Sequence, residues 1–254
     1  MHFIDLNCDL GESYGSYKIG NDKEVLKHIS SANIACGYHA GDHNVMMETV
    51  NLAKKHNVRI GAHPGFPDIP GFGRREMNLS PKEIYNLVLY QIGALAAITQ
   101  VQGVNLVHVK PHGALYNMAS TSTPIAEAIV QAIIDFDSKL ILFGLSGSEL
   151  IQAGKEKGLV TAEEVFVDRT YQPNGTLTTR TEQNSMIHDM KVAVERMTRM
   201  VKEGKVTAVD GTDIKITADT ICVHGDEPAA LDLIKELKDA FTKEEILIRK
   251  CWSE

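Results

Sequence analysis

The chain has 254 residues and a formal net charge of −7, and a single α/β barrel typically has roughly 250 residues. Its acidic balance and scattered lysines and arginines argue against a nucleic-acid partner. No apolar run approaches the roughly 18 residues of a membrane span, and the N-terminus has no basic signal-peptide region, so we expect a cytoplasmic protein without membrane contact.

Short apolar runs alternate with helical patterns, which predicts βα units around a parallel sheet in one domain over residues 1–254. The seven candidate strands are Phe3–Leu10, Ala32–Cys36, Val58–Ala62, Leu106–Lys110, Lys139–Gly144, Glu164–Asp168 and Thr220–His224. A β-hairpin is expected before the seventh strand, from Val206–Val209 and Ile214–Ile216 around Asp210-Gly211.

Helices are predicted in the intervals between these strands. Ser80-Pro81-Lys82-Glu83 has the pattern of a capping box, with proline in the first turn. The expected helices run from Asp22 to Ile29, from Asp42 or Asn44 to Asn57, from Ser80 to Gly103, from Thr123 to Phe136, from Ser148 to Gly158, from Ile187 to Val201 and from Pro228 to about Phe241.

Each of five predicted strands has an apolar side and a polar side, because side chains alternate along a strand. In the first strand, Asp5, Asn7 and Asp9 lie opposite the aliphatic residues. Four later strands place ionisable groups on their polar side: Arg59, His63, His108, Lys110, Glu164, Asp168, Cys222 and His224. These groups gather at the C-terminal strand ends, where parallel α/β folds build active sites, so we expect a site there.

Three kinds of chemistry suit these residue types. A divalent metal could be held by Asp9, His39, His43 and His63, although the sequence contains no HExxH motif. Metal-free acid–base hydrolysis could use the carboxylates, histidines and Lys110, and Lys110 could alternatively form a Schiff base. No phosphate-binding glycine motif is present, and the four cysteines, without CxxC spacing, are expected to be buried thiols.

Six sequence blocks, in order from Asp5 to about Leu231, resemble the LamB/YcsF family. The blocks are DLNCDLGE at 5–12, NIACGYHAGD at 33–42, GAHP with PD and GFGRR between 61 and 75, HVKPHGALYN at 108–117, EVFVDRTY at 164–171 and CVHGD at 222–226. Two positions depart from the family pattern: Val167, where alanine is frequent, and His43, where proline is common. The second departure argues against His43 as an obligatory ligand.

The resemblance implies a seven-stranded (β/α) barrel of the glycoside hydrolase/deacetylase type. It implies that the protein opens 5-oxo-L-proline to L-glutamate together with partner subunits PxpB and PxpC. ATP would be the co-substrate and would bind with Mg²⁺. A lactam carbonyl is a poor electrophile, and phosphorylation of its oxygen would activate it, which accounts for the need for ATP. Cations near the phosphate would then be required.

On this basis we assign candidate roles to residues. The catalytic candidates are Asp9, His63, Lys110, His112, Asp168 and His224. The candidates for binding substrate or phosphate are Asn7, Asn33, His39, Arg74, Arg75 and Arg169. A divalent metal at the barrel mouth would be held by Asp9, His39 and His63.

Two alternative functions stay open on the residues alone. One is a metal-dependent amidase or deacetylase that acts on a carbohydrate-like substrate. The other is a carrier subunit that binds the lactam and passes it to a partner.

Overall fold

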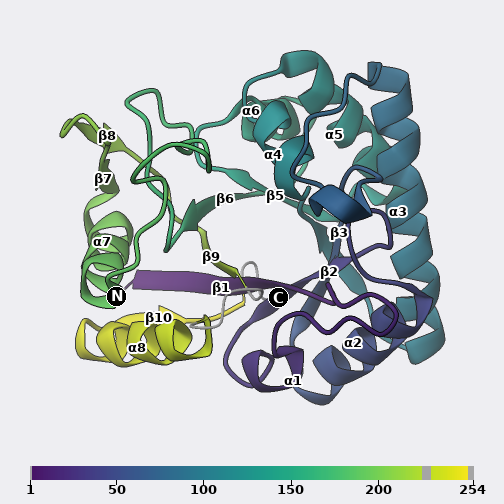
Figure 1. Cartoon of the computed structure of the whole chain (residues 1–254), viewed down its shortest axis with the longest axis horizontal. Helices are drawn as coiled ribbons and strands as arrows, with labels where there is room; N and C mark the ends of the chain where they lie inside the picture. Colours follow the sequence, from purple (N-terminus) through teal and green to yellow (C-terminus); the bar gives the residue numbers. More distant parts are fainter. Residues whose placement is uncertain (1, 225–229, 251–254) are drawn as a thin grey trace.

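The computed structural model describes residues 2–224 and 230–250. Its central feature is a closed barrel of seven parallel strands, in which β9 pairs with β1 (Figure 1). The strands are β1 (His2–Leu10), β2 (Ser31–Ala35), β3 (Arg59–His63), β4 (Leu106–Val109), β5 (Ile141–Leu145), β6 (Thr161–Phe166) and β9 (Thr220–His224). The predicted fold class is therefore confirmed.

Helices surround this barrel, as expected for βα units (Figure 1). The predicted capping box is present, since the Ser80 hydroxyl accepts from the Glu83 N–H and the Glu83 carboxylate accepts from the Ser80 N–H. The helices are α1 (Asp22–Val25), α2 (His43–Lys55), η1 (Ile69–Gly71), α3 (Pro81–Gln102), α4 (Gly113–Ala119), α5 (Thr123–Asp137), α6 (Glu149–Glu156), α7 (Met190–Glu203) and α8 (Ala230–Lys243). Pro228, the predicted start of the last helix, lies outside the described residues.

The predicted hairpin is confirmed as β7 (Lys205–Thr207) paired antiparallel with β8 (Asp213–Lys215). Three short elements were not predicted, and one of them is η1. The helix α4 directly follows the fourth strand, and β10 (Ile246–Ile248) adds to the beginning of β1, outside the closed ring. Elements this short carry too few residues to show a periodicity in the sequence.

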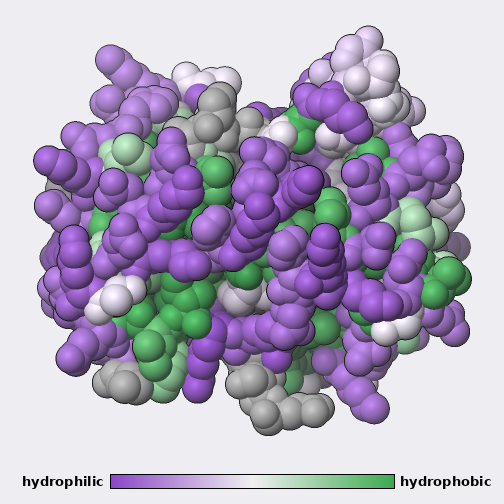
Figure 2. All heavy atoms as spheres, turned by 90° about the horizontal axis from the view of Figure 1, so that it is seen from below, coloured by the Kyte–Doolittle hydropathy of each residue, from purple (hydrophilic) through white to green (hydrophobic). Residues whose placement is uncertain are grey.

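One correction concerns α3, which is long and apolar enough, by length and composition alone, to cross a membrane. The sequence was expected to hold no such stretch. In the structure α3 packs against α5 and α2 and against the sheet, with Ile84, Val88, Ile92 and Leu95 buried. This burial accounts for part of its hydrophobicity, while Tyr90 and Val101 of the same helix are exposed. On the face shown in Figure 2, hydrophilic side chains predominate, with smaller hydrophobic areas between them.

In the strands that have a polar side, the aliphatic side faces the helices and the polar side faces the barrel interior. The strand β5 differs, because its Phe143 stacks on His108 and forms a small apolar cluster with Ile141 and Ala162. Ile4, Leu6 and Cys8 belong to the hydrophobic core, whereas Asp5 and Asn7 are buried in hydrogen-bond networks. Buried polar groups are tolerated only when they are hydrogen-bonded. The predicted alternation therefore places these polar networks inside an apolar shell.

Asp5 lies towards the N-terminal end of the interior and supports the barrel. Its carboxylate accepts hydrogen bonds from the hydroxyls of Ser30, Ser31 and Thr220, at 2.7, 2.8 and 2.7 Å. Burial raises the pKa of Asp5, and these three hydrogen bonds oppose that rise. This is the role of a structural hydrogen-bond acceptor.

Candidate active site

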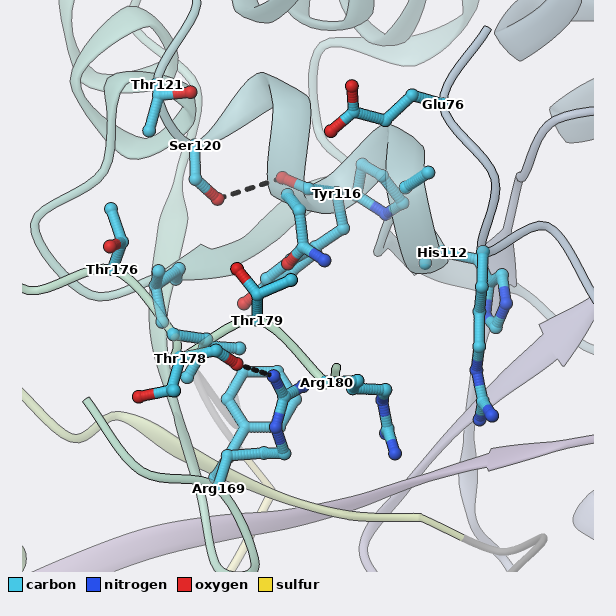
Figure 3. A pocket seen from close by; sticks show the side chains of 18 of the residues that line it. Glu76, His112, Tyr116, Ser120, Thr121, Arg169, Thr176, Thr178, Thr179 and Arg180 are labelled. Carbon is cyan, nitrogen blue, oxygen red and sulfur yellow. Dashed lines mark hydrogen bonds between the residues drawn. The ribbon is translucent and has the colours of Figure 1, made fainter. Parts of the chain in front are cut away.

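A cavity of about 470 Å³ opens at the C-terminal end of the barrel (Figure 3). Asp9, His63, Lys110 and His112 line it where β1, β3 and β4 end. The segment that follows β6 lines another part of it, including Arg169 and Arg180. Four of the six predicted catalytic residues are therefore brought together around one cavity.

Lys110 lies at the centre of the charged interior and is 2% exposed. Its Nζ is 2.9 Å from Asp9 Oδ1, 3.0 Å from Glu164 Oε1 and 2.9 Å from Cys222 Sγ. Burial alone would lower the pKa of Lys110, but the neighbouring anionic groups, Asp9 foremost, raise it well above its usual value. Lys110 therefore remains an ammonium, which has no lone pair for the Schiff base considered from the sequence.

Asn7 and Asn33 hold the carboxylates in place rather than reaching the cavity. The Asn33 amide donates to Asp9 Oδ1 at 2.8 Å and to Asn7 Oδ1 at 2.7 Å. The Asn7 amide donates to Glu164 Oε1 at 2.9 Å. Neither asparagine lines the cavity, and the hydrogen bonds of both belong to the network that supports the carboxylates.

A second cluster joins three histidines and one glutamate beside Asp9. Glu12, His39, His63 and His112 are all buried, and their ligand atoms lie within 4.8 Å of one another, so the group could hold a metal ion. His39 and His63 belong to the predicted metal site, whereas Glu12 and His112 were not in it. Asp9, the third predicted ligand, pairs with Lys110 and is not in this group.

The surroundings of His39 and His112 favour their neutral imidazoles. Burial, followed by the neighbouring histidines, lowers the pKa values of His39 and His112 well below the ordinary range. The His39 ring stacks on His112 with a centroid distance of 3.7 Å. Neutral imidazole is the form that ligates metals.

The predicted arginines divide into two groups. Arg74 and Arg169 line the cavity, and the Arg169 guanidinium donates to the carbonyl of Thr178 (Figure 3). Burial, followed by the charge of Arg180, lowers the pKa of Arg169 to about 10. Arg75 instead pairs with Asp68 and does not line the cavity, so the structure does not bring it together with the other two.

Two other predicted residues do not line the cavity, and the side chain of a third lies outside the described residues. Asp168 is buried but is not part of the cavity lining, although its neighbour Arg169 is. His43 is exposed at the first residue of α2 and lies outside the metal-ligand group. The side chain of His224 lies outside what the structure describes, although its backbone pairs with Asp9.

Several functional positions were missed by sequence reasoning. Glu12, Glu164 and Tyr116 all lie in the family-like blocks but were assigned no role. Tyr116 donates from its hydroxyl to Glu164 Oε2 at 2.8 Å, and burial with the nearby carboxylate raises its pKa well above the ordinary value. Glu164 was visible on the polar side of its strand. Nothing in the sequence pattern pointed to Arg180.

The described cysteines agree with the prediction of buried thiols. Cys8, Cys36 and Cys222 are free and buried, while Cys251 lies outside the described residues. Cys222 is the only one of the three whose sulfur contacts Lys110.

Comparison with known proteins identifies close relatives over the full length. The A subunit of 5-oxoprolinase from Oceanobacillus iheyensis is 62% identical over 97% of this chain and 96% of its own. The same subunit from Halalkalibacterium halodurans is 59% identical over 98% and 97%. The crystal structure of a lactam utilization protein from Thermus thermophilus superposes with a TM-score of 0.91, at 46% identity over 97% of this chain and 98% of that one.

A more distant structure shares the fold only. The T48 deacetylase superposes with a TM-score of 0.51 at 14% identity, over 97% of this chain and 87% of its own. The profile of the LamB/YcsF family matches residues 4–253, nearly the whole chain. Together with the relatives above 50% identity, this match shows that the chain belongs to the LamB/YcsF family.

Proposed function

We propose that this chain is the A subunit of a 5-oxoprolinase, which acts in the cytoplasm with partner subunits PxpB and PxpC. The assembly would hydrolyse 5-oxo-L-proline to L-glutamate at the expense of ATP, which would bind together with Mg²⁺. The observation that carries the proposal is the 62% identity, over nearly the full length, to a protein of that name. The charged cavity at the barrel mouth supports it, because it offers both a base and cations.

The reaction balances with two water molecules. Transfer of the γ-phosphoryl group of ATP to the lactam oxygen releases ADP and makes the ring carbon electrophilic. Water adds to that carbon, the carbon–nitrogen bond breaks, and the ring nitrogen leaves as the amine of a glutamyl phosphate. A second water then releases inorganic phosphate and L-glutamate. Each addition needs a base for the water proton and positive charge near the oxygens.

Asp9 and Lys110 are placed for these two needs. Both line the cavity, and the Lys110 ammonium lies 2.9 Å from Asp9 Oδ1. We assign to Asp9 the removal of a proton from the attacking water. Lys110 donates a hydrogen bond to the lactam or phosphoryl oxygen, which stabilises the negative charge that develops there.

Arginines at the cavity would bind the anionic parts of the substrate. Arg169 is 4% exposed and lines the cavity, and its Nε has no hydrogen-bond partner within the described residues. Arg74 and Arg180 line the same cavity. A guanidinium can bind a carboxylate or phosphate with two parallel hydrogen bonds, and we therefore assign the substrate carboxylate or the phosphate to this group.

The test is an assay of glutamate release from 5-oxo-L-proline by the chain alone and with both partner subunits, each with and without ATP. We expect release only from the complete set with ATP. Glutamate formation by the chain alone without ATP would indicate a simple amidase. Absence of glutamate from every combination would overturn the assignment.

A single-residue series separates the enzyme from a carrier. In the complete assembly, Asp9→Asn and Lys110→Met should each abolish most glutamate release. Tight binding of 5-oxo-L-proline without any loss of rate in either variant would indicate a carrier instead.

A further inference from the structure

Four buried side chains lie close together, each at the end of, or in the segment after, one of the four neighbouring strands β1 to β4. Glu12 follows the end of β1, His39 lies in the loop after β2, His63 ends β3, and His112 follows β4 as the N-cap of α4. Their burial is nearly complete, with exposed fractions between 1% and 5%. Three imidazoles and a carboxylate without solvent need partners for their polar atoms, because unpaired buried polar groups are costly.

The hydrogen bonds of His63 and His112 leave two lone pairs facing each other. His63 Nδ1 lies 2.7 Å from the carbonyl oxygen of Lys110, and His112 Nε2 lies 2.8 Å from that of Phe72. A carbonyl only accepts, so each of these ring nitrogens carries the proton. In the neutral rings His63 Nε2 and His112 Nδ1 are then both acceptors, and they lie 2.9 Å apart.

The surroundings of His39 also indicate that a cation binds between these side chains. Neither of its ring nitrogens has a hydrogen-bond partner within the described residues, although the ring is 1% exposed. Its Nε2 lies 3.6 Å from Glu12 Oε1. A single proton shared between His63 and His112 would join those two rings but would leave His39 without a partner. One cation reached by all four side chains accounts for every member of the group.

From this geometry we propose that Glu12, His39, His63 and His112 form a site for one divalent transition-metal ion of the zinc kind. Imidazole nitrogens favour zinc and its neighbours in the periodic table over Mg²⁺, which prefers oxygen ligands and water. The backbone carbonyls that accept from His63 and His112 are the outer partners that metal-bound histidines ordinarily have. The Mg²⁺ that accompanies ATP would therefore bind elsewhere.

Binding requires the ligands to move closer together. Zinc with nitrogen ligands at about 2.0–2.1 Å places tetrahedral ligand atoms about 3.3 Å apart, and here they lie within 4.8 Å. His39 and His112 are stacked in parallel, so one ring must turn for both lone pairs to reach the ion. His39 has no hydrogen bond to hold it and is the ring that can turn. Gly65 packs directly against this ring, and a Cβ at position 65 would lie only 2.6 Å from His39 Nδ1.

The proposed site adjoins the floor of the cavity, because His63 and His112 also line that cavity. When bound, such an ion supplies a Lewis acid that polarises a carbonyl or lowers the pKa of water. Asp9 stays outside the ligand group because its Oδ1 is bound by Lys110 and Asn33, although its Oδ2 is 3.4 Å from His63 Nε2. This assignment concerns metal binding and does not depend on the proposed reaction.

The test measures metal directly on the full chain. The protein is stripped with a chelator, dialysed against excess Zn²⁺ and then against buffer, and analysed for metal by mass spectrometry. We expect about one zinc ion per chain, and addition of Co²⁺ to the stripped protein should give the intense visible absorption of a low-coordinate nitrogen site. Less than about a tenth of an ion per chain together with no visible Co²⁺ band would overturn the proposal.

Variants test the ligand set. Glu12→Gln and His39→Gln should weaken Zn²⁺ binding at least about ten-fold, whereas His43→Gln, the exposed neighbour, and Asp9→Asn should retain it. Circular dichroism establishes that each variant is folded. Loss of metal from folded Asp9→Asn with retention in Glu12→Gln would refute this ligand set. Full metal content in the folded chain without glutamate release from the assembly would refute the proposed reaction and leave the metal site standing.

Discussion

At the level of single residues, the charge of Lys110 is balanced by two carboxylates that are buried with it. Asp9 and Glu164 lie 2.9 and 3.0 Å from its ammonium, and both belong to the asparagine network of the barrel interior. A buried ion pair contributes little net stability compared with apolar packing, but removal of one partner leaves an uncompensated charge. The cluster should therefore be sensitive to loss of the lysine.

Lys110→Met is expected to lower the free energy of unfolding by about 3–5 kcal/mol, because Asp9 and Glu164 lose their counter-charge. The matched control is Lys155→Met, which breaks a half-exposed pair with Glu163 and should change stability by less than about 1 kcal/mol. Urea denaturation at neutral pH measures both. Equal losses in the two variants would contradict the assigned role of the buried charges.

A second residue-scale prediction concerns acid stability. His108 is buried against Phe143, and burial, followed by the charge of Lys110, lowers its pKa to about 3. In the unfolded chain the His108 imidazole takes up a proton near pH 6.5, whereas in the folded chain it stays neutral at that pH. The folded state is therefore fully stabilised by the neutral His108 only above pH 6.5. This stabilisation is lost as the pH falls from about 6.5 towards 3, with a total on the order of several kcal/mol.

His108→Gln keeps a donor for Asn33 but cannot be protonated. The variant should lose less stability than the parent between pH 7 and pH 4, as measured by urea denaturation at a series of pH values. His43→Gln removes an exposed histidine and serves as the control. Identical pH profiles for the parent and His108→Gln would show that His108 does not cause the loss of stability in acid.

At the level of elements, the alternation of side chains along the strands builds the site. β3 shows how tightly the interior is packed, since Gly61 faces the His108 ring of β4. A Cβ at position 61 would lie 2.1 Å from two atoms of that ring. The two strands can pair in this register only because position 61 has no side chain.

Gly61→Ala should destabilise the fold by about 3 kcal/mol, because neither the strand backbone nor the buried ring can move away freely. Gly93→Ala in α3 is the control: no heavy atom lies within 4 Å of the added methyl group, and alanine favours a helix by up to about 1 kcal/mol. Thermal and urea unfolding compare the two. A Gly61→Ala variant as stable as the parent would show that the interior is looser than described.

At the level of the whole molecule, the barrel is closed by the pairing of β9 with β1. Thr220 joins the two strands through its side chain as well as its backbone. Its hydroxyl donates to Asp5 Oδ2 and accepts from the Asn7 amide, both at 2.7 Å. This buried contact links residues separated by more than 200 positions in sequence, and it connects closure of the barrel with the network beneath the cavity.

Thr220→Val keeps the shape of the side chain and removes both hydrogen bonds. We expect a loss of about 2–4 kcal/mol, because a buried acceptor and a buried donor lose their partner. Thr198→Val in α7 is the control, since the Thr198 hydroxyl bonds only to the preceding helical turn at Val194, and it should cost less than about 1 kcal/mol. A similar small effect at both positions would contradict the importance of Thr220 for closure.

Much of this architecture was accessible from the sequence because it is encoded locally. Hydrophobic period and helix caps predicted all seven barrel strands, the hairpin and most helices to within a few residues. The single-domain prediction over residues 1–254 stays a prediction. The short elements α4 and β10 escaped because they depend on tertiary packing rather than on a repeating pattern.

Strand alternation is a local property, so the sequence alone was enough to predict which polar residues face the barrel interior and at which end they gather. Which of them touch was decided only by closure of the barrel. Strand curvature and loop paths bring Glu12 to the three histidines, direct Asp9 to Lys110 and leave Arg75 on Asp68. Contacts between distant segments depend on three-dimensional packing. The sequence pattern could therefore identify the candidate site residues, but it could not predict which of them contact each other.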